Sequence, residues 1–335
     1  MIKTCDPLSP RIIDCLNTEY GIDVAAITLL PLGADRNASV YKAQTIEGLS
    51  YFVKLKRGLH HDVSVTLLEF LHDAGIQQII APVKTTQNRS IQHMDGYTLI
   101  VYPFVDGQDG FSQNLTKDQW VVLGKVLRQV HEVTVPSFIE QRIRRELYSS
   151  RWRESVRALY TQLETKLADD EITVLMARFL KNHQDVIHHL VNQAELLSQK
   201  MQELSPKFVL CHSDIHGGNV LIAENTSIYI VDWDAPIMAP KERDLMFIGG
   251  GVANVWNNPS EEGFFYKGYG ETEVNWIIMA YYRYERIVED IAEYGNELLL
   301  NIASTNDRSE SYRHFTDIFV PGGVLDIALK TEERI

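Results

Sequence analysis

The sequence contains little cysteine and no long hydrophobic run. Its three cysteines, Cys5, Cys15 and Cys211, include no CxxC pair and cannot build a disulfide framework, which favours a reducing compartment. The N-terminus lacks the continuous apolar segment of a signal peptide, and no later stretch approaches the roughly 18 apolar residues that a membrane span needs. We therefore expect a cytoplasmic protein that does not associate with membranes.

Basic residues are also scarce, because 32 lysines and arginines stand against 45 aspartates and glutamates. The resulting formal net charge of −13 disfavours a surface that binds the phosphates of nucleic acid. The same charge favours a cationic small molecule as a partner. Nothing in the sequence indicates an obligate protein partner.

Two common site motifs are missing as well. The chain has no GxxxxGK[ST] motif, which disfavours a P-loop NTPase. The histidine-rich segment NHQDVIHHL, residues 182–190, is typical of a helix whose histidines lie on different faces. A zinc site there is therefore not expected.

The composition is that of a globular protein, with 45% hydrophobic and 23% charged residues over 335 positions. From about residue 28 to 105, segments rich in β-branched and aromatic residues predict an antiparallel sheet interrupted by one helix, which Gly75 ends. Amphipathic helices follow, at about 117–133, 151–166, 170–202 and 275–300. We predict an α+β fold with two lobes, a small β-rich lobe (1–105) and a larger, mainly helical lobe (106–335).

Polar residues concentrate in the segment CHSDIHGGNVLIAENTSIYIVDWDAP, residues 211–236. Asn219 opens one apolar run and Asp232 ends the next, so a β-hairpin would bring their side chains to the same end of two strands. Their oxygens could chelate Mg²⁺. Asp214, in a tight turn, could orient a hydroxyl or accept its proton. Local chemistry alone leaves a solvated, side-chain-capped turn as the alternative.

The pattern His-x-Asp-x-x-x-x-Asn followed by Ile-Val-Asp resembles the Brenner motif of the aminoglycoside phosphotransferase family, which shares the protein-kinase fold. The resemblance implies that Asp214 is the catalytic aspartate and that Asn219 and Asp232 bind Mg²⁺. It also implies ATP as co-substrate and transfer of its γ-phosphoryl group to an alcohol.

Upstream segments fit the same family. In YFVKLK, Lys54 occupies the position of the lysine that binds the α- and β-phosphates, and Glu69 on the following helix is its expected ion-pair partner. The loop LPLGADRNASVYKA has Gly33 as its only glycine, so the GxGxxG of protein kinases is absent. Phosphate contacts are expected from backbone amides of three residues at its end: Asn37, Ala38 and Ser39.

The segment LIVYPFVDGQ falls where the family has its hinge. The resemblance places the Pro103 carbonyl and the Val105 amide against the adenine edge. Candidates for substrate contact are Trp233 and Tyr269, which could stack on a flat or sugar-like ligand, and Asp234, which could equally pair with a backbone amide.

Three neighbouring residues are expected to be structural. His212 is expected to satisfy local backbone groups, and His216 to pack in the turn. Asp244 is expected to brace the catalytic loop from within, because the family keeps a similar Asp-Leu there. The segment YYRYERIVEDI, residues 281–291, reads as a core-facing aromatic stripe, although its acidic or tyrosine side chains could line a substrate pocket.

Three segments, HSDIHGGNVL, VDWDAP and YYRYERIVEDI, resemble the branch of the family that phosphorylates the aminocyclitol antibiotic spectinomycin. This resemblance implies ATP- and Mg²⁺-dependent transfer to a hydroxyl of a cationic aminocyclitol, which yields ADP and antibiotic resistance. Two alternatives stay open. The chain could phosphorylate another small alcohol, such as choline, homoserine, methylthioribose or another aminoglycoside, or it could bind nucleotide without catalysis.

Overall fold

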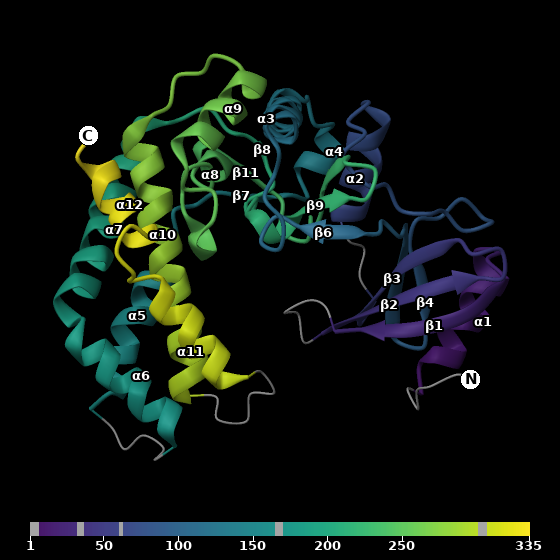
Figure 1. Ribbon diagram of the computed structural model, residues 1–335, viewed down its shortest axis with the longest axis horizontal. Coiled ribbons are helices and arrows are strands. Elements are labelled where there is room, and N and C mark those ends of the chain that lie inside the picture. Colours follow the sequence, from purple (N-terminus) through teal and green to yellow (C-terminus); the bar gives the residue numbers. More distant parts are fainter. Residues whose placement is uncertain (1–6, 32–36, 60–62, 165–169, 301–306) are drawn as a thin grey trace. The chain divides into compact units, whose positions relative to one another are not determined.

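The computed structural model describes residues 7–31, 37–59, 63–164, 170–300 and 307–335 (Figure 1). Contacts along the chain divide it into two compact units. The first contains residues 1–113, 134–143 and 219–236, and the second contains 114–133, 144–218 and 237–335. This division differs from a single boundary after residue 105, because a later hairpin pairs with a strand of the first unit.

A five-stranded antiparallel sheet forms the body of the first unit. Its order is β1 (Val24–Leu30), β2 (Ala38–Thr45), β3 (Ser50–Arg57), β5 (Tyr97–Pro103) and β4 (Gln92–Met94). Helix α1 (Ser9–Glu19), which the sequence did not predict, lies beside this sheet (Figure 1). Its Ile12 and Leu16 share one buried core cluster with Val53 and Leu55 of β3. The predicted antiparallel sheet is confirmed.

The position of Lys54 in strand β3 fixes the sheet face on which its side chain lies. Side chains alternate across a strand, so Lys54 lies on the face opposite Val53 and Leu55. Its partners in the neighbouring strands are Val40 and Ile100. Lys54 therefore emerges on the sheet face that α1 does not cover.

The remaining elements of the first unit are short. Helix α2 (Val63–Asp73) buries its leucines, and Gly75 follows it with φ +90°, as the predicted stop requires. Strands β6 (Gly107–Asp109), β9 (Val220–Ala223) and β10 (Ile228–Ile230) form an antiparallel sheet in the order β10-β9-β6. Helix α4 (Ser137–Glu140) contacts α2. The β9–β10 pairing confirms the predicted hairpin.

Helices dominate the second unit. The α-helices are α3 (Lys117–Glu132), α5 (Arg151–Gln162), α6 (Glu171–Asn182), α7 (Gln184–Leu204), α8 (Glu242–Leu245), α9 (Pro259–Tyr269), α10 (Trp276–Gly295), α11 (Arg308–Asp317) and α12 (Val324–Glu332). Single turns are η1 (Gly217–Asn219), η2 (Val252–Asn254) and η3 (Asn296–Leu300). A small sheet has the order β7 (Arg144–Arg145), β11 (Ile237–Ala239), β8 (Val209–Cys211). No described helix combines the length and apolarity that crossing a membrane requires.

Two helix boundaries can be compared with the helix ranges predicted from the sequence. Helix α3 begins at Lys117, as predicted, and Thr116 and Gln119 form the capping box that starts it. The single helix expected over 170–202 is wrong, because the chain breaks at His183 into α6 and α7. The His183 ring stacks on Phe179 at 3.8 Å between centroids, and its Nδ1 lies 2.9 Å from the Phe179 carbonyl oxygen. These local contacts compensate for the interrupted helix.

Helix α10 runs through the second unit and contacts α5, α7 and α12 (Figure 1). Its buried tyrosines, Tyr281, Tyr282 and Tyr284, form the predicted core-facing stripe. Helices α3 and α9 approach unusually closely because two glycines lie at their contact. A Cβ atom at Gly268 would stand 1.9 Å from the Val121 carbonyl oxygen, so no larger residue fits there.

Candidate active site

Asp244 holds the backbone of the turn that carries Asp214. This carboxylate, fully buried on α8, accepts the His212 amide at 2.8 Å and the Ser213 amide at 2.7 Å. Burial opposes its ionisation, but hydrogen bonding and charge from His131 outweigh burial and lower the pKa of Asp244. The predicted brace is confirmed, and it fixes the backbone directly before Asp214.

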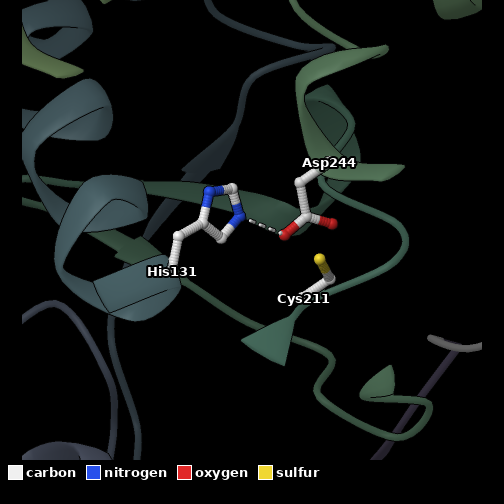
Figure 2. Close-up of side chains that lie close together, drawn as sticks. All are labelled: His131, Cys211 and Asp244. Carbon is white, nitrogen blue, oxygen red and sulfur yellow. Dashed lines mark hydrogen bonds and ion pairs between the residues drawn. The ribbon is translucent and has the colours of Figure 1, made fainter. Parts of the chain in front are cut away.

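The brace continues through a buried polar cluster that Figure 2 shows around Asp244. His131 Nε2 lies 3.1 Å from Asp244 Oδ2, and its Nδ1 lies 2.8 Å from the Tyr269 hydroxyl. Cys211 has its Sγ within 4.8 Å of the other two ligand-type atoms, as a metal site would require. However, Asp244 already accepts two backbone amides, and burial raises the Cys211 thiol pKa well above its ordinary value. We interpret the cluster as structural.

Asp214 itself lies between two basic side chains. Arg286 on α10 donates from Nη1 to Oδ1 at 2.6 Å, and His216 Nε2 lies 3.4 Å from Oδ2. Burial would raise the pKa of Asp214, but the hydrogen bond from His216 and the charge of Arg286 lower it below its ordinary value. Asp214 is therefore ionised near neutral pH and can accept a hydrogen bond from a hydroxyl.

Arg286 was not predicted from the sequence as a site residue. It lies within YYRYERIVEDI, whose buried tyrosines dominated the pattern and indicated a core helix. The segment contained one further signal, which is an arginine followed four residues later by an aspartate. Arg286 Nε does bind Asp290 Oδ1 at 3.0 Å, but a spacing of four residues cannot reveal the third partner, Asp214.

Asn219 and Asp232 flank the β9–β10 hairpin at the same end, as predicted. Val220 pairs with Ile230, and the next amide, that of Val231, donates to the Asn219 carbonyl oxygen at 3.0 Å. Asn219 is buried, whereas 56% of the Asp232 side chain is exposed. An amide oxygen and a carboxylate are hard oxygen ligands, so this donor set fits Mg²⁺.

Lys54 does not form the expected ion pair with Glu69. Its Nζ lies 2.5 Å from Asp234 Oδ2 and 3.9 Å from Asp232 Oδ1. Glu69 instead pairs with Lys84 at 3.3 Å and accepts a hydrogen bond from the Ser90 hydroxyl. The expectation of a Lys54–Glu69 pair is therefore corrected, because the chain following β10 supplies nearer carboxylates.

Asp234 bridges two lysines of β3. Its second oxygen, Oδ1, lies 3.2 Å from Lys56 Nζ, while Oδ2 binds Lys54. Residues two apart share one face of a strand, so a single carboxylate can reach both ammonium groups. The backbone-amide pairing considered for Asp234 is thus replaced by a bridge between charged side chains.

The described residues expected to bind the adenine edge and the phosphates also belong to the first unit. Pro103 ends β5, and the Val105 amide that follows donates no hydrogen bond to a described residue. The Asn37 carbonyl oxygen accepts a hydrogen bond from the Arg57 amide at 2.8 Å, and Ala38 and Ser39 are the first residues of β2. Gly33 lies outside the described residues.

Two aromatic candidates for substrate stacking are buried. Trp233 is 3% exposed and donates its indole N–H to the Ile230 carbonyl oxygen at 3.1 Å. Tyr269 is 2% exposed, its ring stacks on Phe265, and its hydroxyl meets His131. These expectations are corrected, because a ring enclosed by protein presents no face to a ligand.

The profile of the phosphotransferase enzyme family matches residues 28–262, which include the hairpin, the Asp214 turn and Lys54. The chain belongs to this family. Its members carry the kinase-like fold, so the α+β, kinase-like architecture predicted from the sequence is confirmed. No curated protein matches the chain.

Solved structures of other phosphotransferases resemble the protein over nearly its whole length. Spectinomycin phosphotransferase APH(9)-Ia, in complex with ADP and spectinomycin, is 48% identical, with 97% of this chain and 98% of that chain covered and a TM-score of 0.91. The AMP-bound complex of the same enzyme is 47% identical, with 96% and 98% covered and a TM-score of 0.87. An aminoglycoside phosphotransferase from Alicyclobacillus acidocaldarius is 14% identical, with 99% of both chains covered and a TM-score of 0.66, and shares the fold.

Proposed function

We propose that this phosphotransferase transfers the γ-phosphoryl group of ATP to a hydroxyl of spectinomycin and thereby confers resistance to it. The observation that carries the proposal is the 48% identity, over 97% of the chain, to an enzyme whose structure contains ADP and spectinomycin. Kinases of other small alcohols share the fold at much lower identity, so the alternative acceptors have weaker support. The use of ATP agrees with the expected cytoplasmic location.

In this proposal the first unit binds the nucleotide. Lys54 leaves Asp234 and binds the α- and β-phosphates, whose negative charge replaces that of the carboxylate. The Val105 amide, which donates to no described residue, and the Pro103 carbonyl bind the adenine edge. The amides of Asn37, Ala38 and Ser39 contact the phosphates. Glu69 has no direct role, because its partners are Lys84 and Ser90.

Asn219 and Asp232 would hold Mg²⁺. When bound there, the ion supplies positive charge to the phosphate oxygens as the bond to the leaving group breaks. The two side chains come from the same end of one hairpin, so the rigidity of the paired strands sets their positions. Lys54 contributes the second positive charge from the neighbouring sheet.

Asp214 aligns the acceptor hydroxyl. A bond forms between the acceptor oxygen and the γ-phosphorus, the bond from that phosphorus to the β,γ-bridging oxygen breaks, and ADP leaves. The hydroxyl proton passes to Asp214. Because the lowered pKa makes Asp214 a weak base, the proton transfers late, when the acceptor oxygen has become acidic through its bond to phosphorus.

An acceptor panel tests the proposal. ADP release by the purified protein with ATP and Mg²⁺ should depend on spectinomycin and should stay at background with choline, kanamycin, homoserine or methylthioribose. Asp214→Asn should lose most turnover and keep its affinity for ATP. Release with a different acceptor would replace spectinomycin in the proposal, and ATP binding without transfer to any acceptor would support a non-catalytic role.

A further inference from the structure

Arg286 is the charged side chain nearest to Asp214 in the second unit. Its Nη1 binds Asp214 Oδ1 at 2.6 Å, and its Nε binds Asp290 Oδ1 at 3.0 Å on the next turn of α10. The guanidinium carbon lies 5.7 Å from the centroid of the Phe247 ring, which also contacts His216. Arg286 thus has three neighbours that restrict it, and only 21% of its side chain is exposed.

This arrangement bears on how a cationic acceptor meets the catalytic carboxylate. Spectinomycin carries two methylamines that are cationic near neutral pH, and an isolated aspartate attracts an ammonium group more strongly than it attracts a hydroxyl. An ammonium bound to Asp214 would leave no hydroxyl aligned with the phosphoryl group. A guanidinium already bound to Asp214 weakens that attraction, although Asp290 shares the same positive charge.

We propose that Arg286 is a positioning and specificity residue for phosphoryl transfer, which fixes the Asp214 carboxylate and offsets its charge so that a hydroxyl binds there in preference to an ammonium group. The ammonium preference rests on the proposed function, whereas the fixing of Asp214 applies to any alcohol acceptor. Asp290 supports the fixing of Asp214, because it holds the same guanidinium through Nε at 3.0 Å.

Several other charged groups of the second unit surround this pair. They are His216 on the Asp214 turn, Asp244 beneath it with His131 and His212, and Glu289, Asp290 and Glu293 on α10. The acidic groups of α10 favour protonation of any neighbour, while Arg286 opposes it at Asp214. Removing Arg286 therefore takes away a positive charge bound directly to Asp214, while the acidic groups of α10 stay.

The test compares Arg286→Met, which removes the charge at similar length, with Arg286→Lys, which keeps it. Arg283→Lys is the matched control, because Arg283 on the same helix binds Thr331 and main-chain carbonyls instead of Asp214. For Arg286→Met we expect kcat to fall about 100-fold, the cost of a misplaced catalytic group. Its Kd for spectinomycin, measured by calorimetry, should stay equal or become up to about 10-fold tighter.

Two further measurements separate positioning from a general structural role. The acidic limb of kcat against pH should move upward in Arg286→Met, because Asp214 loses the charge that favours its ionised form. Added guanidinium should restore part of kcat in Arg286→Ala, and Arg286→Lys should recover about 10-fold of the loss. The control should lower the melting temperature while its pH profile stays unchanged.

Two results would overturn the proposed role of Arg286. Wild-type kcat in Arg286→Met would do so, as would a parallel loss of spectinomycin affinity and kcat with an unshifted pH profile. If Arg286→Met does not fold, Arg286→Lys decides, and its kcat should fall about 10-fold with Kd unchanged. If the wild-type protein ignores spectinomycin but phosphorylates another alcohol, the proposed function fails, and the kcat, pH and rescue measurements with that alcohol still test Arg286.

Discussion

Asp234→Asn should tighten nucleotide binding while it lowers turnover. In the structure Asp234 holds Lys54 at 2.5 Å and Lys56 at 3.2 Å, so phosphate must replace the carboxylate at Lys54 before the nucleotide is fully bound. At 3.2 Å and an effective dielectric constant of 20, one such pair corresponds to about 5 kcal/mol of gross Coulomb energy. Desolvation and exposure of 36% of the Asp234 side chain reduce this greatly.

A net contribution of about 1–2 kcal/mol for the two contacts is consistent with partly exposed pairs, and it corresponds to a 5- to 30-fold tighter Kd. The same substitution should lower kcat, because the product ADP binds more tightly and therefore leaves more slowly. The assay is calorimetry with ADP in EDTA, which removes any contribution of a metal ligand, followed by steady-state kinetics with ATP and Mg²⁺.

The matched control is Glu19→Gln. Glu19 forms one ion pair in the same unit, with Arg89 at 3.1 Å, and touches none of the proposed nucleotide contacts. Its Kd for ADP should not change. An unchanged or weaker Kd in Asp234→Asn would refute the reasoning, because it would mean that the carboxylate does not compete with phosphate for Lys54.

The remaining predictions concern the corrected ion pair, the brace and a buried acid. Glu69→Gln should change kcat less than about 3-fold, since Glu69 binds Lys84, and steady-state kinetics would expose a larger role. Asp244→Asn should lower the melting temperature and also kcat, because two backbone amides before Asp214 lose a charged acceptor. Burial raises the pKa of Glu285 from 4.5 to about 7 despite Arg153, so the folded chain binds the extra proton between these values. Its contribution to the free energy of unfolding therefore falls as pH rises through this window, and Glu285→Gln should flatten the melting temperature, followed by circular dichroism, over the same range.

Local patterns predicted the elements whose signals are local. The hairpin that brings Asn219 and Asp232 together follows from two apolar runs with a polar turn between them. The end of α2 before Gly75 and the capping box at Thr116 likewise depend on residues that are close in the sequence. The break at His183 was missed because the apolar period continues across it, and only the stacking on Phe179 shows why the helix ends.

Long-range partners were beyond such patterns. Lys54 and Asp234 are 180 residues apart, and Arg286 and Asp214 are 72 residues apart. The resemblance to kinases supplied an expected partner for Lys54, but the choice between Glu69 and Asp234 depends on how the chain after β10 meets the sheet. Which cation reaches a carboxylate is decided by tertiary packing, and a single sequence does not reveal it.

In each unit, a charge proposed to act on a ligand is already paired within the chain. Lys54, proposed for the phosphates, pairs with Asp234, and Asp214, proposed for the acceptor, pairs with Arg286. Ligand affinity then reflects a difference between two sets of interactions, because binding replaces or competes with a resident ion pair. Removing the resident partner should therefore tighten or preserve ligand binding while it lowers kcat. We expect this opposite movement of Kd and kcat in Asp234→Asn for ADP and in Arg286→Met for spectinomycin, whereas simple loss of structure would weaken both.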